Sequence, residues 1–155
     1  MRMPTGPGRI GSERGMTMIE MVIGLAITGA LSLFMGTELR AMADRVYLDT
    51  AVAEVVGDLR YARSMAVREG EPIQVAVGAD QPGVTLFRAS DPAQPVAPTR
   101  DLKDRGVRVI RSSGGRLLSF QPRGTSATPT TLTLEGRRGD QRVVTVSLTG
   151  IVRAR

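Results

Sequence analysis

One long stretch without a helix breaker dominates the first half of the sequence. Residues 16–36 carry a single charge, Glu20, and the first proline after that point is Pro72. About 20 consecutive apolar residues are enough for a helix that crosses a bilayer. No stop is indicated before Gly70, which together with the following proline is typical of a helix end. The sequence therefore predicts a helix over Met16–Glu69, about 80 Å long, which no single small domain can bury.

The two halves of this predicted helix differ in polarity. Residues 16–36 are compatible with lipid, whereas residues 37–70 combine charged positions with one apolar face, as in an amphipathic helix. That face is formed by residues spaced three and four apart, namely Leu48, Val52, Val55, Leu59, Ala62 and Ala66. We therefore divide the chain into a disordered basic leader (1–15), an apolar helix half (16–36), an amphipathic helix half (37–70) and a β-rich globular head (71–155).

After the helix, the period of the apolar residues changes to two, which predicts β-strands. The predicted strands are bounded by Gly, Pro or Asp and cover Ile73–Val77, Val84–Arg88, Val107–Arg111, Leu117–Gln121, Thr130–Glu135 and Arg142–Leu148. The first two are expected to form a hairpin. The predicted fold is therefore α+β, with a long N-terminal helix whose amphipathic half packs on a small antiparallel β-sheet domain.

The composition argues against catalysis. The chain contains neither histidine nor cysteine, which removes imidazole acid–base chemistry, thiol nucleophiles, disulfides and the usual zinc sites. A secreted or anchored enzyme is the alternative, and it finds no nucleophile motif here. We expect a protein that is not an enzyme and that has no catalytic residues, no metal site and no cofactor.

Positive charge collects in the last third of the chain. Residues 16–104 contain 8 basic and 12 acidic residues, whereas residues 105–155 contain 10 basic and 2 acidic ones. This asymmetry indicates an anionic partner, with candidate contacts at Arg137, Arg138, Arg142, Arg153 and Arg155. The last two alternate along an extended chain and are expected to point to one face. Arginines that contact phosphates would give salt-sensitive DNA binding, and pairing with the acidic surface of a neighbouring subunit is the alternative.

The N-terminal region carries a recognisable signature. Residues 14–20, R-G-M-T-M-I-E, stand before an apolar helix, and this arrangement resembles the processing signature of type IV pilins and of the related pseudopilins of type II secretion. The resemblance implies that prepilin peptidase cuts after Gly15 and methylates the new amine of Met16. Glu20 then stands at the position of the family's glutamate. Its implied role is to pair with the Met16 amine of a neighbouring subunit, since the two charges offset each other's burial cost.

Three later segments resemble the GspH/FimT group of minor pilins and pseudopilins. They are L-R-Y-A-R-S-M-A-V-R-E-G-E-P-I, L-L-S-F-Q-P-R-G-T and the closing V-S-L-T-G-I-V-R-A-R. Within them, we expect Arg63 to be a surface or buried-pair arginine, and Gly124 to occupy a turn that requires a positive φ. Some FimT-like pilins bind DNA through a tail that resembles G-R-x-R. Here Ile151 stands in place of the first arginine, so the match is partial.

The resemblance implies a structural subunit of a type II secretion pseudopilus or of a type IV pilus, and both remain open. The chain would first be a single-pass protein of the bacterial inner membrane with its head outside the cytoplasm, and then part of a periplasmic or extracellular filament. The implied partners are prepilin peptidase, the inner membrane and other pilins or pseudopilins. One alternative is a DNA-binding minor pilin for natural transformation. Another is a secreted protein whose conventional signal peptide is cleaved near Ala43.

Overall fold

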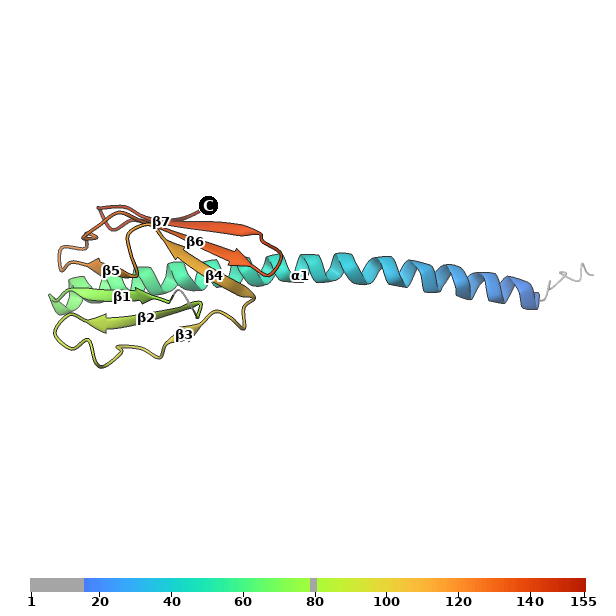
Figure 1. Ribbon diagram of the computed structural model, residues 1–155, viewed down its shortest axis with the longest axis horizontal. Helices are drawn as coiled ribbons and strands as arrows, with labels where there is room; N and C mark the ends of the chain where they lie inside the picture. The colour runs from blue at the N-terminus through green and yellow to red at the C-terminus, as the bar shows by residue number, and fades with distance from the viewer. Residues whose placement is uncertain (1–15, 79–80) are drawn as a thin grey trace, which may run out of the picture. The chain divides into compact units, whose positions relative to one another are not determined.

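The computed structural model describes residues 16–78 and 81–155, and for residues 34–38 the description is limited to the backbone. In this part of the chain one helix, α1 (Met18–Glu69), precedes the strands (Figure 1). The strands are β1 (Ile73–Val77), β2 (Gly83–Arg88), β3 (Arg100–Asp101), β4 (Val107–Ser112), β5 (Leu117–Phe120), β6 (Thr130–Gly136), β7 (Gln141–Val146) and β8 (Val152–Ala154). The α+β fold class is confirmed.

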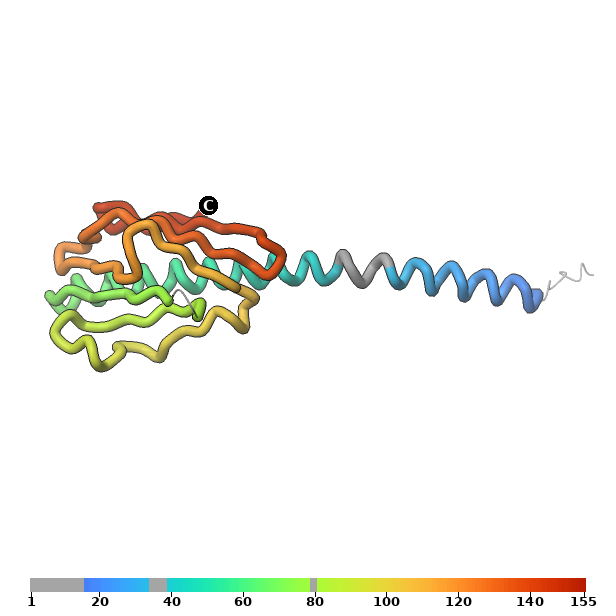
Figure 2. The backbone as a smooth tube through the Cα atoms, in the orientation of Figure 1, coloured from blue at the N-terminus to red at the C-terminus, as the bar shows by residue number. Residues whose placement is uncertain are grey.

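The described residues divide into two compact units, one that ends at Leu39 and one that covers residues 40–155. We call the second one the core unit, and its backbone is traced in Figure 2. All residues of the hydrophobic core cluster lie between Leu48 and Val152. The core unit therefore contains the whole apolar burial that drives its folding.

The predicted apolar face of the helix is confirmed. Leu48, Val52, Val55, Leu59, Ala62 and Ala66 are all buried, and Ala51, Val56 and Met65 widen the same face. The helix ends as expected, because Gly70 adopts φ 68° and its N–H donates to the carbonyl of Ala66 at 3.1 Å. A residue with a side chain would be strained in that conformation. The strands therefore pack on this apolar face of α1.

The strands form two antiparallel sheets of four strands each. We call them sheet A, with the order β3-β2-β1-β5, and sheet B, with the order β4-β6-β7-β8. In sheet A the register places Val75 between Leu86 and Leu118, so that three buried side chains meet above the helix. In sheet B, Leu132 and Val144 form a corresponding buried pair. The alternation of buried and exposed residues predicted from the sequence thus gives each sheet one face for the core.

Six strands match the predicted ones in position, whereas β3 and β8 are additional and β7 is shorter than predicted. Strand β3 was not predicted, because it is two polar residues long and carries no alternation. Strand β7 ends at Val146 rather than at Leu148, since the chain turns there. Gly150, with φ 73°, donates its N–H to the carbonyl of Ser147 at 2.9 Å, and β8 then returns beside β7.

Candidate functional site

The N-terminal candidate residues surround the start of α1. Gly15 lies outside the described residues, and Met16 is exposed. The N–H of Glu20 donates to Oγ1 of Thr17 at 3.3 Å. Thr17 therefore caps the helix, and its spacing from Glu20 is that of a capping box. This local role was not predicted, although the pattern T-x-x-E before an apolar run is visible in the sequence.

The apolar half of α1 buries none of its described side chains. Every residue from Met16 to Leu33 is exposed, and the large apolar ones among them are Met16, Met18, Ile19, Met21, Val22, Ile23, Leu25, Ile27, Leu31 and Leu33. Within the part of the chain that the structure describes, no helix is both long enough and apolar enough to cross a membrane. Residues 41–43, the alternative cleavage site for a signal peptide, lie in the interior of the helix.

In the core unit, α1 is joined to the strands by a series of ion pairs that we call the charge ladder. Each pair links an acidic residue of the helix to an arginine that lies far along the chain. The pairs are Asp44–Arg138 at 3.0 Å, Asp49–Arg142 at 2.7 Å, Glu54–Arg105 at 2.9 Å, Asp58–Arg100 at 2.6 Å and Glu69–Arg88 at 3.0 Å. The ladder therefore follows the helix from its entry into the core unit to its end.

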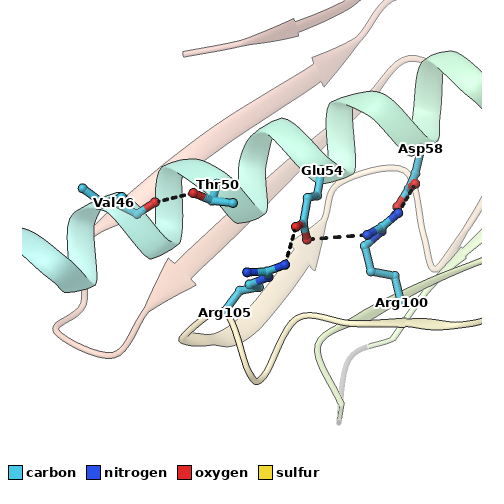
Figure 3. A network of polar contacts seen from close by, with 6 residues as sticks. All are labelled: Val46, Thr50, Glu54, Asp58, Arg100 and Arg105. Atoms are coloured by element: carbon cyan, nitrogen blue, oxygen red, sulfur yellow. Dashed lines mark hydrogen bonds and ion pairs between the residues drawn. The ribbon is translucent and has the colours of Figure 1, made fainter.

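The centre of the ladder is a small network (Figure 3). The guanidinium of Arg100 donates to both carboxylate oxygens of Asp58, at 2.6 and 3.1 Å, and lies 3.7 Å from Glu54. Arg105 holds the other oxygen of Glu54. Hydrogen bonding to Asp58, together with the charges of both carboxylates, raises the pKa of Arg100. The two-pronged geometry is the strong form of an arginine–carboxylate pair.

We expect Arg100→Ala to destabilise the core unit by about 1–2 kcal/mol at low salt. The substitution leaves two carboxylates without their shared cation, and both are only one-fifth exposed or less. The loss should shrink as salt screens the exposed part of the network. Urea denaturation at low and at high ionic strength measures both effects.

Arg111→Ala is the matched control for Arg100→Ala. Arg111 is 74% exposed and its only ion-pair contact in the described chain is at 4.0 Å, so its removal should change the free energy of unfolding by less than about 0.5 kcal/mol. Equal losses for the two variants would show that the network contributes nothing specific.

The ladder changes the interpretation of the C-terminal arginines. Arg138 and Arg142 are paired with the helix within their own chain. Part of the charge asymmetry of the sequence is therefore internal complementarity, because three of the ten basic residues in 105–155 pair with acidic residues of α1, namely Arg105, Arg138 and Arg142. Arg137 lies beside Gly106 and lines a groove of about 490 Å³ together with Lys103 and Arg108. The five candidate arginines thus do not form one patch.

Arg153 and Arg155 do lie together. They line one groove of about 420 Å³ on the outer face of β7 and β8, together with Thr145, Ser147, Thr149 and Ile151. The expectation that alternate residues of the tail share a face matches this geometry. Neither arginine has an acidic partner within 4 Å among the described residues.

Arg63 binds two turns, one of which, residues 147–150, borders this groove. Its Nε donates to the carbonyl of Gly124 at 2.8 Å, and its Nη2 to the carbonyl of Thr149 at 3.4 Å. Arg63 is thus half-buried and binds backbone carbonyls, rather than the carboxylate expected of a buried pair. The predicted positive φ of Gly124 is present, at 77°. Because Gly150 packs against the same carbonyl of Gly124, helix and both turns meet at one point.

Comparison with known proteins identifies the family. The sequence model described as type II transport protein GspH matches residues 51–150, well over half of the chain. The chain belongs to the GspH family. The match covers the buried half of α1 and all strands up to the turn before β8. The GspH family is part of the superfamily of type IV pilins and type II secretion pseudopilins, so the resemblance indicated by the sequence motifs is confirmed.

Solved structures share the fold of this GspH-family chain. The type IV minor pilin FimU of Pseudomonas aeruginosa is 22% identical, with a TM-score of 0.61 over 74% of this chain and 92% of FimU. The minor pseudopilin EpsH from the type 2 secretion system of Vibrio cholerae is 19% identical, with a TM-score of 0.59 over 70% of this chain and 95% of EpsH. No curated protein sequence matches the chain.

Proposed function

We propose that this GspH-family chain is a structural, non-catalytic subunit of a filament, either a type II secretion pseudopilus or a type IV pilus. One observation carries the proposal. The described side chains of residues 16–33 are exposed and mostly apolar, while the amphipathic half of the same helix buries its apolar face in the core unit. Exposed apolar surface on this scale needs a partner outside the chain. Other pilins or pseudopilins provide one, because their N-terminal helices have the same character.

The proposed route to the filament is the one implied by the resemblance of residues 14–20 to the pilin processing signature. Prepilin peptidase would cut after Gly15 and methylate Met16. Residues 16–36 carry a single charge, and the structure describes their side chains only as far as Leu33; in this proposal they hold the chain in the inner membrane with the core unit outside the cytoplasm. During assembly the apolar helix leaves lipid for a bundle of similar polarity, so the transfer costs little free energy. The Cα hydrogens of Gly24 and Gly29 face open space in the isolated chain, which leaves room for close approach by a neighbouring helix.

Glu20 is proposed to set the register of assembly. Its side chain is exposed, and within the described residues no cation lies within ion-pair distance of its carboxylate. The capping contact uses the backbone N–H of Glu20 and the hydroxyl of Thr17, so the carboxylate itself stays available. In a helical bundle it would pair with the Met16 amine of the adjacent subunit, since a buried carboxylate without a partner is strongly unfavourable.

The test is Glu20→Ala in the native host, with incorporation into sheared filaments measured by immunoblot. We expect at least about a tenfold loss of incorporation, while mass spectrometry still finds a mature N-terminus at Met16. Thr17→Ala is the matched control, because it removes the helix cap and keeps the carboxylate. Normal incorporation of the Glu20 variant would contradict the pairing role. A mature chain beginning at Asp44 would instead support the conventional signal peptide.

A further inference from the structure

Strand β8 leaves one edge of sheet B open. It is the last strand in the order β4-β6-β7-β8. The N–H and carbonyl of Arg155 both bond to Val143, at 2.8 and 3.1 Å, and the carbonyl of Ile151 accepts from Ser147 at 3.1 Å. Alternation along an antiparallel strand then directs the backbone groups of Val152 and Ala154 away from β7. These groups are a template for one more strand.

The side chains beside this edge determine what kind of strand fits. Arg153 and Arg155 stand two residues apart on the same face, so they are separated by about 6.8 Å along the strand. Residues at alternate positions of an added strand have the same spacing, and directly opposite side chains come within about 5.5 Å between Cβ atoms. Carboxylates at those positions would each meet one arginine.

We propose that β8 is a docking edge for an extended, acidic segment of a neighbouring protein, which adds to sheet B as a fifth strand. Main-chain hydrogen bonds to Val152 and Ala154 supply affinity, and the two arginines supply selectivity for alternating carboxylates. The same arginines repel a second copy of β8, because like charges on directly opposed strands are destabilising. The edge is thereby protected from self-pairing and kept for a partner of opposite charge.

The observations favour a peptide over a nucleic acid. Arg138 and Arg142, which would extend the basic surface, are already bound to Asp44 and Asp49. Phosphate binding scales with the number of cations engaged, and two arginines are few. The outward N–H groups of this edge alternate with outward carbonyls, and a carbonyl oxygen repels a phosphate oxygen but accepts from the N–H of an added strand. An open edge of this kind is the defining requirement of strand addition.

The inference rests on the proposed function only in naming a filament subunit as the source of the strand. Binding of a synthetic peptide is therefore measured independently of filament assembly. The probe is a fluorescent peptide of alternating threonine and glutamate, titrated with the full chain in non-ionic detergent micelles and followed by anisotropy. Two further peptides serve as comparisons: one with glutamine in place of glutamate, and one whose alternate backbone nitrogens are methylated. A short DNA duplex is the fourth probe.

We expect the glutamate peptide to bind, and the glutamine and N-methylated peptides to bind at least about tenfold more weakly. Arg153→Ala combined with Arg155→Ala should lower the affinity for the glutamate peptide about tenfold. Arg108→Ala combined with Arg111→Ala removes the same charge from β4, the opposite edge strand of sheet B, and should leave this affinity unchanged. Ala154→Pro removes an outward N–H without breaking a bond to β7. It should weaken binding and leave the thermal unfolding midpoint unchanged.

Several results would overturn the docking edge. Equal binding of the methylated peptide, or of Ala154→Pro, would show that no strand is added. Equal losses for the two double variants would show that only net charge matters. Arginine-dependent binding of the duplex without binding of the peptide would assign the tail to DNA instead.

Discussion

Replacing Gly150 with alanine is expected to destabilise the core unit by about 2–4 kcal/mol. Gly150 adopts φ 73°, a left-handed conformation that disfavours a side chain. A Cβ atom at this position would also overlap the carbonyl oxygen of Gly124 and press on Nε of Arg63. The backbone carbonyl cannot move without disturbing the turn before β6. Urea denaturation of the fragment covering residues 40–155 measures the loss.

Gly139→Ala separates the two contributions to that loss. Gly139 has a similar φ, 84°, but a Cβ there would meet nothing within 4 Å. This variant should therefore show the conformational penalty alone, about 1 kcal/mol. If both variants lost the same stability, the contact among Arg63, Gly124 and Gly150 would add nothing to the turn. A larger loss for Gly150→Ala assigns the difference to that contact.

Phe120→Ala is expected to cost about 3–5 kcal/mol, the range for removing a fully buried aromatic side chain. Phe120 is completely buried at the end of β5. It lies beside Ile73 in the register of sheet A and pairs with Ser126 across the following turn. Its loss leaves a cavity in the hydrophobic core at the end of β5. The fragment covering residues 40–155 should unfold at a markedly lower urea concentration.

Leu117→Ala on the same strand is the control for Phe120→Ala. Leu117 is half-exposed and belongs to the opposite face of β5, so its removal should cost less than about 1 kcal/mol. Comparable losses for the two variants would mean that burial in sheet A does not determine stability. Far-UV circular dichroism of the native state checks that both variants still fold.

The sequence was sufficient for those elements that local periodicity determines. The stripe from Leu48 to Ala66 is a helical repeat, and alternation in T-L-T-L marks β6, so both could be predicted from neighbouring residues. The division into two sheets could not. Strand pairing joins residues far apart in the chain, and a period of two does not say which strands are neighbours. Strand β3 has no periodicity at all, since its two residues are both charged.

The candidate sites show the same difference between local patterns, which could be predicted, and long-range contacts, which could not. Gly15, Met16 and Glu20 were recognised from a contiguous motif, and their roles in processing and assembly remain predictions. The C-terminal arginines were grouped by their position in the sequence, which could not reveal that Arg142 reaches Asp49 or that Arg138 reaches Asp44. Charged residues on a helix are usually solvated, so a single sequence does not indicate which of them form ion pairs with residues far along the chain. The cap formed by Thr17 did have one, because a capping box is a local pattern.

The charge ladder also has a mechanical consequence. Its rungs join α1 to both sheets, through Arg88 and Arg100 from sheet A and through Arg142 from sheet B. A pull along the helix axis would have to stretch these rungs together, in shear, rather than open them one after another. A set of bonds that are stretched together resists a larger force than the same bonds broken one after another. The rungs therefore add to the buried apolar face of α1 in holding both sheets to the helix when it is pulled along its axis.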